Sequence, residues 1–411
     1  MHTRGSSPRR KRLSVKWRRS IAGQELNRPL WYIVSSMTAK VLMLGWGFPP
    51  NVSGGLDTHV GEMFERLEDR EDVDIELVLP AEYAPDREGI VGVPTGEGDI
   101  ITRIGRLGST FAERAADADI VHTHDWFGYG PGSRAKSNNE DVEWVTTFHS
   151  LSSDRNIDPP QREVETERRI AERCDHLLAV SELLADKVKR EYGGDCHVIY
   201  NGFSECETTG RDLKEELGID GKMLFFVGRH TDQKGISHLV YAMEKLARDD
   251  VTLVMGGSGH LTAQLKRFAE LLGVEDRIKW AGYVPEEALG DYYASADLFV
   301  SPSLSEPFGI TIVEALSTGT RVVATESGAA EVLPEDCVIE VEPDSRSIAD
   351  GIEYGLSLDG EPEYEPYTWD RVVDETVAYY HSILDGDDDP SAGAENEVDA
   401  GDADAAESDA N

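Results

Sequence analysis

The sequence predicts an α/β protein with two domains, each built around a doubly wound parallel sheet. At 411 residues the chain is long enough for two domains of ordinary size, each with its own core. Short apolar segments alternate with helical segments from Lys40, and a second alternation opens at Met223. The clearest unit is a strand at 298–300, a loop at 302–309, a helix from Ile310 and a strand at 321–324, which together form a βαβ unit.

The first domain is predicted over residues 37–201. Apolar runs indicate strands at 41–44, 75–79, 119–122, 144–149, 176–180 and 197–200, and helical spacing indicates helices at 58–67, 161–173 and 182–191. Ser181 is placed to cap the last of these helices. Between the first strand and the first helix, Gly54 and Gly55 would let backbone amides approach a phosphate or sugar oxygen. By itself such a pair is more often a tight turn.

Histidines follow two of these strands. His122-Thr123-His124-Asp125-Trp126 lies at the carboxyl end of one strand, and His149 ends another at the same rim. Ligands of open parallel sheets bind at these ends, so the motif is a candidate site. We expect His122 and His124 to point to opposite faces, one packed inside and one directed at the ligand.

The second domain is predicted over residues 202–365, with further strands at 223–227, 251–255 and 278–281 and helices at 236–246 and 261–272. The loop Gly228 to Gly235 places Arg229 and Lys234 so that both reach one point beyond the sheet. Cations there would stabilise negative charge that develops on a leaving diphosphate. Two further loops are in position for backbone contacts to a base, and they contain Gly257, Gly259, Tyr283 and Val284.

Two carboxylates bracket the helix that begins near Ile310. Glu306 lies in the preceding loop and Glu314 one turn into the helix, where free amides and the helix dipole favour an anion. Both acids could accept hydrogen bonds from sugar hydroxyls, so the pattern suits a sugar joined to a phosphate. Because 79 of 411 residues are acidic, the spacing of Glu306 and Glu314 alone is not evidence for a site, and an ordinary solvated loop and helix is the alternative. The Glu-Pro-Phe-Gly sequence around Glu306, between a buried strand and a helix, makes the prediction of a site stronger.

The charge is extreme and unevenly distributed. Residues 1–36 carry nine Lys/Arg and one acid, so the rest carries 40−9=31 bases against 79−1=78 acids, a net charge of −47. Residues 37–411 are therefore expected to repel nucleic acid and anionic lipid. We interpret the excess of acids as adaptation to high internal salt, which screens their repulsion. Residues 1–36 are predicted to be a basic disordered extension, with Met37 as an alternative start, and residues 385–411, with eleven acids and no base, a disordered tail.

The four cysteines are scattered, without a Cys-x-x-Cys pair or a histidine at ligand spacing. This predicts a reduced, cytoplasmic protein without structural zinc. No apolar run approaches 18 residues, so no transmembrane segment is expected, and the run after the early arginine pair is too short for an export signal. Composition leaves the oligomeric state open.

The joint pattern resembles retaining glycosyltransferases of family 4, which have the two-domain GT-B fold of Rossmann-like domains. The glycine loop, His-x-His-Asp-Trp, Gly-Arg-x4-Lys-Gly, Gly-x-Gly and Glu-Pro-Phe-Gly-x4-Glu occur in the family's order over residues 40 to about 384. The front motifs are most similar to the glycogen-synthase-related branch. That branch has a lysine two residues before the Gly-Gly pair where this chain has Val52, which puts ADP-glucose and an α-glucan acceptor in doubt.

The resemblance implies a nucleotide-diphosphate sugar as donor and a carbohydrate or other hydroxyl as acceptor, with no cofactor. Arg229 and Lys234 would hold the diphosphate, Glu306 the transferred sugar and Glu314 the ribose, while His124 would contact the sugar near the reacting carbon. Amides of Phe308, Gly309 and Ile310 would bind sugar and phosphate, and Gly54 and Gly55 would line the donor side.

We expect retaining transfer of a hexose by front-face attack without a metal, because no Asp-x-Asp is placed to hold one and no nucleophilic carboxylate stands out. A nucleotide-sugar epimerase of the same fold and a catalytically silent sugar-binding homologue are the alternatives. The acceptor is expected in loops at 83–106 and 128–139. The amphipathic helix at 366–384 is expected to cross back and complete the first domain.

Overall fold

The computed structural model of the chain describes residues 38–49, 54–334 and 336–386. The extension predicted over residues 1–36, Val52 and the acidic tail beyond Gly386 lie outside the described residues. Within the described residues, no helix combines the length and apolarity needed to cross a bilayer. The predicted domain boundaries stay predictions.

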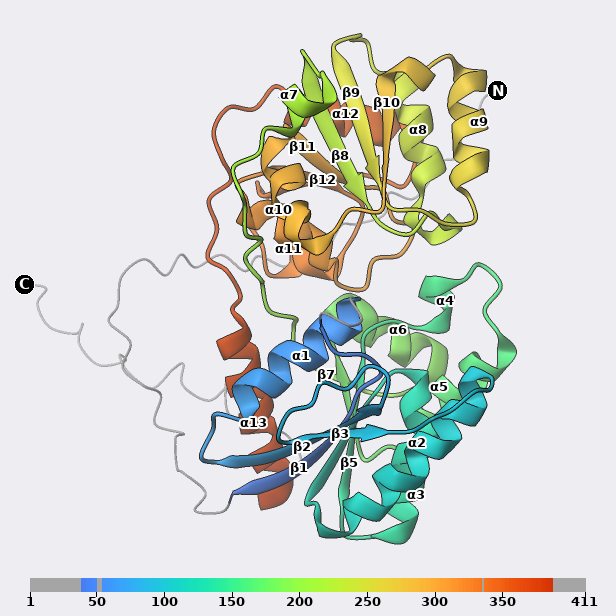
Figure 1. Ribbon diagram of the computed structural model, residues 1–411, viewed down its shortest axis with the longest axis vertical. Helices are drawn as coiled ribbons and strands as arrows, with labels where there is room; N and C mark the ends of the chain where they lie inside the picture. The colour runs from blue at the N-terminus through green and yellow to red at the C-terminus, as the bar shows by residue number, and fades with distance from the viewer. Residues whose placement is uncertain (1–37, 50–53, 335, 387–411) are drawn as a thin grey trace, which may run out of the picture. The chain divides into compact units, whose positions relative to one another are not determined.

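The first half of the chain forms a parallel sheet with the strand order β3-β2-β1-β4-β5-β6-β7 (Figure 1). Its strands are β1 (Ala39–Leu44), β2 (Val73–Pro80), β3 (Ile90–Val93), β4 (Ile120–His124), β5 (Glu143–Phe148), β6 (His176–Ala179) and β7 (His197–Val198). Its helices are α1 (Gly55–Leu67), α2 (Ile100–Arg114), α3 (Tyr129–Asn138), α4 (Ser152–Arg155), α5 (Gln161–Arg173) and α6 (Glu182–Tyr192). The inner strands are almost wholly buried, as parallel strands covered on both faces are.

The second half forms another parallel sheet, with the order β10-β9-β8-β11-β12-β13. Its strands are β8 (Lys222–Val227), β9 (Val251–Gly256), β10 (Ile278–Gly282), β11 (Leu298–Ser301), β12 (Val322–Ala324) and β13 (Val338–Glu340). Its helices are α7 (Leu213–Leu217), α8 (Ile236–Lys245), α9 (Thr262–Leu272), α10 (Glu286–Ser295), α11 (Ile310–Ser317) and α12 (Ser345–Gly355). The predicted fold of two doubly wound, Rossmann-like sheets is therefore confirmed.

The strand order reverses at one point in each sheet. In the first sheet this switch lies between β1 and β4, and in the second between β8 and β11. The loops after these four strands diverge to opposite faces, which leaves a crevice where ligands of such folds bind. The predicted site residues Arg229, Lys234 and Glu306 follow β8 and β11, and His124 ends β4.

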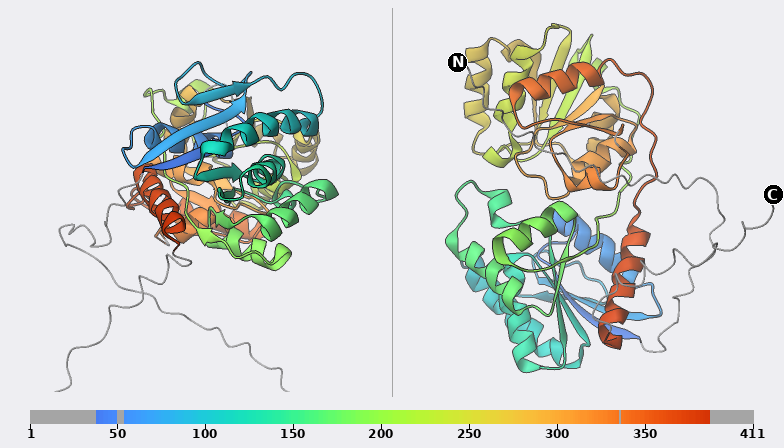
Figure 2. Two further views of the ribbon diagram at one scale, coloured as in Figure 1. Left: turned by 90° about the horizontal axis from the view of Figure 1, so that it is seen from below. Right: turned by 180° about the vertical axis from the view of Figure 1, so that it is seen from behind.

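The last helix, α13 (Trp369–Asp385), returns to the first sheet as expected. Thr368 caps it by accepting a hydrogen bond from Arg371 N, and the predicted apolar stripe is buried. Helix α13 lies beside α1, as both views show (Figures 1 and 2), and Tyr380 OH is 2.6 Å from His122 Nδ1. Arg70 Nη1 also donates to Asp374 Oδ1 over 2.7 Å.

Regular structure occupies segments that we expected to be acceptor loops. Residues 83–106 contain β3 and the first turns of α2, and residues 128–139 contain α3. Pro131 lies in the first turn of α3, where proline is tolerated, because its missing N–H would have no partner within the helix. A Cβ on Gly132 would lie 2.3 Å from Trp144 Cε2, so close packing against the indole requires glycine there, inside the helix. The expectation of loops here is wrong.

Candidate functional site

The loop after β11 brings an acid and a base of the predicted site together. Lys234 Nζ donates to Glu306 Oε2 over 2.6 Å, and Ser303 Oγ donates to the same oxygen over 2.8 Å. Gly309, with a φ of 99°, ends the loop and begins α11, a conformation that only glycine adopts readily. The first amides of α11 are thereby directed beyond the sheet, beside Glu306.

The loops after β8 and β11 pack backbone against backbone. Gly235 has a φ of 58°, and a Cβ there would lie 1.9 Å from the carbonyl oxygen of Pro302. Leu304 N donates to Gln233 O over 2.7 Å. These contacts fix Lys234 at the switch point of the second sheet. The side chain of Arg229 is exposed, and its guanidinium has no hydrogen-bond or ion-pair partner among the described residues.

The first half of the chain also contacts the loop that carries Glu306. Ser305 Oγ donates to Asp154 Oδ1 over 2.5 Å, and Ser181 Oγ donates to Pro307 O over 2.6 Å. A Cβ on Gly55 would lie 3.3 Å from Ile310 Cδ1, so the first residue of α1 approaches the start of α11. Residues from both sheets thus surround one loop.

Glu314 is held by a tyrosine that the sequence did not single out as its partner. Tyr293 OH donates to Glu314 Oε2 over 2.8 Å, and the tyrosine is fully buried. Burial raises the pKa of Glu314, against the hydrogen bond from Tyr293. Burial, and then the nearby carboxylate, raises the pKa of Tyr293, which keeps the hydroxyl protonated as a donor. The pair therefore fixes the direction of the Glu314 carboxylate.

The remaining predicted donor residues differ in exposure. Gly257 and Gly259 pack against the loop after β8, where a Cβ would lie 1.9 Å from Gly228 O and 2.4 Å from His230 O respectively. Close packing of the backbone therefore explains why glycine occurs at both positions, without a contact to a donor. Tyr283 is 80% exposed and Val284 is buried. Phe308 and Gly309 are buried and Ile310 is half-buried, while Gly54 is the exposed cap residue of α1.

Four histidines meet at the carboxyl ends of β4 and β5. His122 and His124 are both fully buried, with ring centroids 4.7 Å apart, so the expectation that they face opposite sides is wrong. Successive side chains alternate along a strand, and residues two apart therefore share a face. His149 joins them with its Nε2 3.1 Å from His124 Nδ1, and His59 of α1 completes the group. Among the described residues, the ring contacts of His124 are therefore with the other three histidines of this group.

Burial sets the protonation of this group. It lowers the pKa of His59 to about 4 and that of His122 to about 3. The pKa values of His124 and His149 are also lowered well below the usual value, first by burial and then by neighbouring histidines. All four imidazoles are therefore neutral at neutral pH. Sequence reasoning missed His59, whose one signal was its place a turn after the glycine loop.

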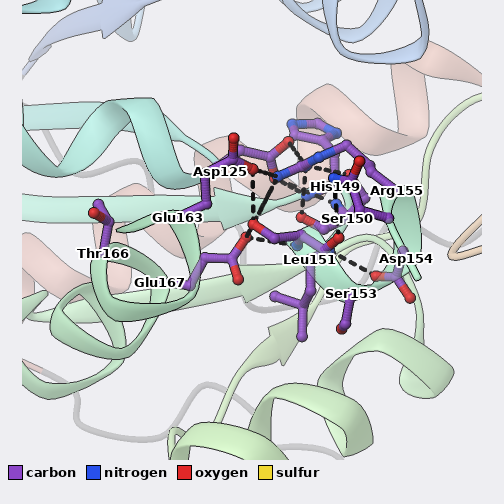
Figure 3. Close-up of polar contacts among 12 residues, drawn as sticks. Asp125, His149, Ser150, Leu151, Ser153, Asp154, Arg155, Glu163, Thr166 and Glu167 are labelled. Carbon is purple, nitrogen blue, oxygen red and sulfur yellow. Dashed lines mark hydrogen bonds and ion pairs between the residues drawn. The ribbon is translucent and has the colours of Figure 1, made fainter. Parts of the chain in front are cut away.

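Asp125, directly after His124, organises the neighbouring loop (Figure 3). It has a φ of 46°, the one positive φ of a non-glycine residue among the described residues. Its Oδ1 accepts hydrogen bonds from His149 N over 2.8 Å and from Ser150 N over 3.3 Å. Arg155 lies between Asp125 and Glu167, at 3.4 Å from each carboxylate. The network fixes where His124 and His149 leave their strands.

Replacing Asp125 by alanine is expected to destabilise the protein by about 2–4 kcal/mol, because two amides and Arg155 lose their acceptor and alanine tolerates a positive φ poorly. Asp125→Asn should destabilise the protein less than Asp125→Ala, because asparagine tolerates a positive φ and keeps one acceptor oxygen. Urea unfolding of both variants measures the difference. Equal losses in the two variants would contradict this role of the carboxylate.

Comparison with known proteins gives consistent matches along the chain. The family model described as Glycosyltransferase Family 4 matches residues 53–205, and the model described as Glycosyl transferases group 1 matches residues 211–365. An uncharacterized glycosyltransferase of Methanocaldococcus jannaschii is 30% identical over 390 residues, covering 84% of this chain and 99% of that protein.

Solved structures share the fold. Sucrose-phosphate synthase from Thermosynechococcus elongatus superimposes with a TM-score of 0.69 at 20% identity, covering 85% of this chain and 100% of that one. HepE of Anabaena, solved in complex with UDP and glucose, superimposes with a TM-score of 0.65 at 18% identity, covering 84% and 100%.

Proposed function

The chain belongs to the glycosyltransferases of family 4, and from this membership we propose that it moves a hexose from a nucleotide-diphosphate sugar to a hydroxyl of a carbohydrate or similar acceptor. We propose further that the transfer retains the anomeric configuration and uses neither a metal nor a cofactor. The observation that carries the proposal is the 2.6 Å contact between Lys234 Nζ and Glu306 Oε2 at the switch point of the second sheet.

A base beside an acid at the start of a helix suits a sugar diphosphate. In this proposal the diphosphate displaces Glu306 from the ammonium of Lys234. The guanidinium of Arg229, which has no hydrogen-bond or ion-pair partner among the described residues, supplies a second cation. Glu306 is then free to accept hydrogen bonds from the transferred sugar. The first amides of α11 donate to the phosphate beside it. Negative charge on the diphosphate increases as the bond to the sugar breaks. The two cations therefore stabilise the transition state more than the bound donor, which lowers the barrier.

Glu314 is assigned to the ribose. Its carboxylate lies near the start of α11, and the hydrogen bond from Tyr293 leaves one of its two oxygens for a ligand. A carboxylate in this place accepts hydrogen bonds from both hydroxyls of a ribose, so it favours a nucleotide over a simple phosphate. Tyr293 acts here through Glu314, as a positioning residue.

Retention is proposed through front-face attack, in which the leaving phosphate takes the proton of the acceptor hydroxyl. We assign His124 to the sugar near the reacting carbon, as a neutral imidazole. We propose that the two halves approach further when substrates bind and so bring His124 to the sugar. We also propose a cytoplasmic site of action, in keeping with the four unpaired cysteines.

Screening UDP-, GDP- and ADP-sugars by thermal shift in concentrated KCl, followed by product analysis, tests the proposal. One donor should raise the unfolding temperature and should be hydrolysed slowly without acceptor, with release of the sugar in its original anomeric configuration. Tyr293→Phe should weaken binding of that donor and not of a matched sugar phosphate that lacks the ribose.

Each of the other outcomes contradicts a different part of the proposed function. Release of the inverted anomer excludes retention, and isomerisation of the donor without acceptor indicates an epimerase. Binding with neither hydrolysis nor transfer indicates a silent homologue. Faster turnover after addition of Mg²⁺ or Mn²⁺ to the chelator-treated chain would contradict metal independence.

A further inference from the structure

Three of the buried histidines come from three different elements and converge. His59 lies in α1, His124 ends β4, and His149 directly follows β5. The ring centroids of His59 and His149 are 4.5 Å apart, and one nitrogen of each of the three rings lies within 4.8 Å of the other two. The convergence is set by tertiary structure, since 90 residues separate the first from the last.

The group is short of hydrogen-bond partners. His59 Nε2, His124 Nε2 and His149 Nδ1 have no hydrogen-bond partner among the described residues. Buried polar atoms in native proteins are satisfied in the large majority of cases, so the orphaned nitrogen of His59 calls for a ligand. His124 Nε2 and His149 Nδ1 are the outer nitrogens of their rings, because His124 Nδ1 and His149 Nε2 face each other. The fourth histidine differs, because both nitrogens of His122 have partners, at 2.6 Å from Tyr380 OH and 2.7 Å from Thr147 Oγ1.

Asn201 determines the tautomer of His59. The Nδ1 of His59 lies 2.8 Å from Asn201 Oδ1, which accepts and cannot donate, so the proton is on Nδ1 and Nε2 keeps a lone pair. A histidine that donates its second N–H to an amide or carboxylate oxygen is the usual arrangement of a metal ligand. His59 is therefore preset to coordinate through Nε2.

The facing nitrogens of His124 and His149 have the spacing of a ligand pair. They are 3.1 Å apart, close to the separation that two Zn–N bonds of about 2.0–2.1 Å give at a tetrahedral ion. With their protons on the outer nitrogens, both rings stay neutral and direct lone pairs at the same region as His59. A cation then takes the place of the proton that the two facing nitrogens would otherwise share.

We propose that His59, His124 and His149 bind one divalent transition-metal ion, with Zn²⁺ as the first candidate. The donor set is three imidazoles without a carboxylate, which suits Zn²⁺, Cu²⁺ or Ni²⁺ and not Mg²⁺ or Ca²⁺. Burial keeps all three rings neutral, the state that coordinates. Coordination ties α1 to the ends of β4 and β5. The ion takes no part in the transfer proposed above, although the two proposals share His124. Coordination through Nδ1 leaves Nε2 of His124, which has no hydrogen-bond partner among the described residues, for the sugar. Metal binding is measured without a donor, so failure of one proposal is distinguishable from failure of the other.

Titration of the chelator-treated full chain with Co²⁺, followed by competition with Zn²⁺, tests the site in concentrated KCl. We expect one Co²⁺ per chain with the intense visible absorption of a tetrahedral or five-coordinate ion, and displacement by Zn²⁺. Asn201→Ala should weaken binding about 10–100-fold, because it removes the group that orients His59. His59→Gln and His149→Gln should abolish the absorption.

His260→Gln is the matched control, because His260 is exposed and paired with Asp232, and it should bind as the native chain does. Zn²⁺ should also raise the unfolding temperature of the native chain and of this control, and not that of His59→Gln. Absence of the absorption overturns the proposal. Equal binding by all variants also overturns it, since surface carboxylates would then hold the ion.

Discussion

Replacing Arg229 and Lys234 together by alanine is expected to lower turnover by several orders of magnitude. Each cation is assigned to the leaving diphosphate, and a preorganised group of this kind contributes on the order of 3 kcal/mol to the transition state. If the two act independently, the losses multiply. Negative charge on the bridging oxygen grows as the bond breaks, so kcat should fall more than donor affinity.

The structure explains why the effect on folding should be small. The guanidinium of Arg229 has no hydrogen-bond or ion-pair partner among the described residues, and Glu306 keeps the hydrogen bond from Ser303 when Lys234 is removed. Lys245→Ala with Arg248→Ala removes an equal charge from the same half of the chain and is the matched control. Initial rates and donor affinities of both double variants are measured in the same KCl concentration. Near-native turnover in the Arg229/Lys234 variant would contradict the assignment.

The site in the second half was largely predictable because its signals are local. The apolar run of β11, the Gly and Pro of the following loop and the start of α11 are contiguous in sequence, and the structure places them within a residue of the prediction. Lys234 and Glu306 are 72 residues apart, yet both follow neighbouring strands of a parallel sheet. Their meeting thus follows from the strand order that such folds adopt.

Other features depend on contacts that no local pattern encodes. The bond from Tyr293 to Glu314 joins two helices, and the partner of His59 is Asn201, 142 residues away. Gly132 of helix α3 is required by close packing against the indole of Trp144 on the neighbouring strand β5. Helix α2 is a different case, since Ile104, Leu107 and Phe111 have helical spacing and are buried, a signal that was present and not used.

Lowering the pH is expected to destabilise the protein steeply through its buried histidines. His59 and His122 have folded pKa values of about 4 and about 3, below the usual 6.5. As the pH falls below 6.5 the unfolded chain binds protons that the folded chain cannot, so stability is lost down to the folded pKa. Each such histidine contributes about 1.4 kcal/mol per pH unit in this window. His124 and His149 act in the same direction.

Buried carboxylates act in the opposite direction, so the slope of the native chain alone does not isolate the histidines. Burial raises the pKa values of Asp125, Glu167 and Glu314, and these groups bind protons more readily in the folded state. Folding therefore gains stability from them as the pH falls through their raised folded pKa values toward the usual values of the unfolded chain. Comparison of variants that share these carboxylates removes their contribution.

His59→Gln, measured by urea unfolding from pH 6.5 to 4.5 with a chelator present, should lose less stability per pH unit than the native chain by about 1.4 kcal/mol. The variant is expected to be less stable at neutral pH, because Gln does not reproduce the hydrogen bond to Asn201, so only the slopes are compared. The control is His260→Gln, because the His260 ring is exposed. This variant should lose as much stability per pH unit as the native chain. Equal slopes in the native chain and in His59→Gln would mean that the buried imidazole takes up its proton without unfolding. The neutral ring assumed for metal coordination would then be an incomplete description of the site.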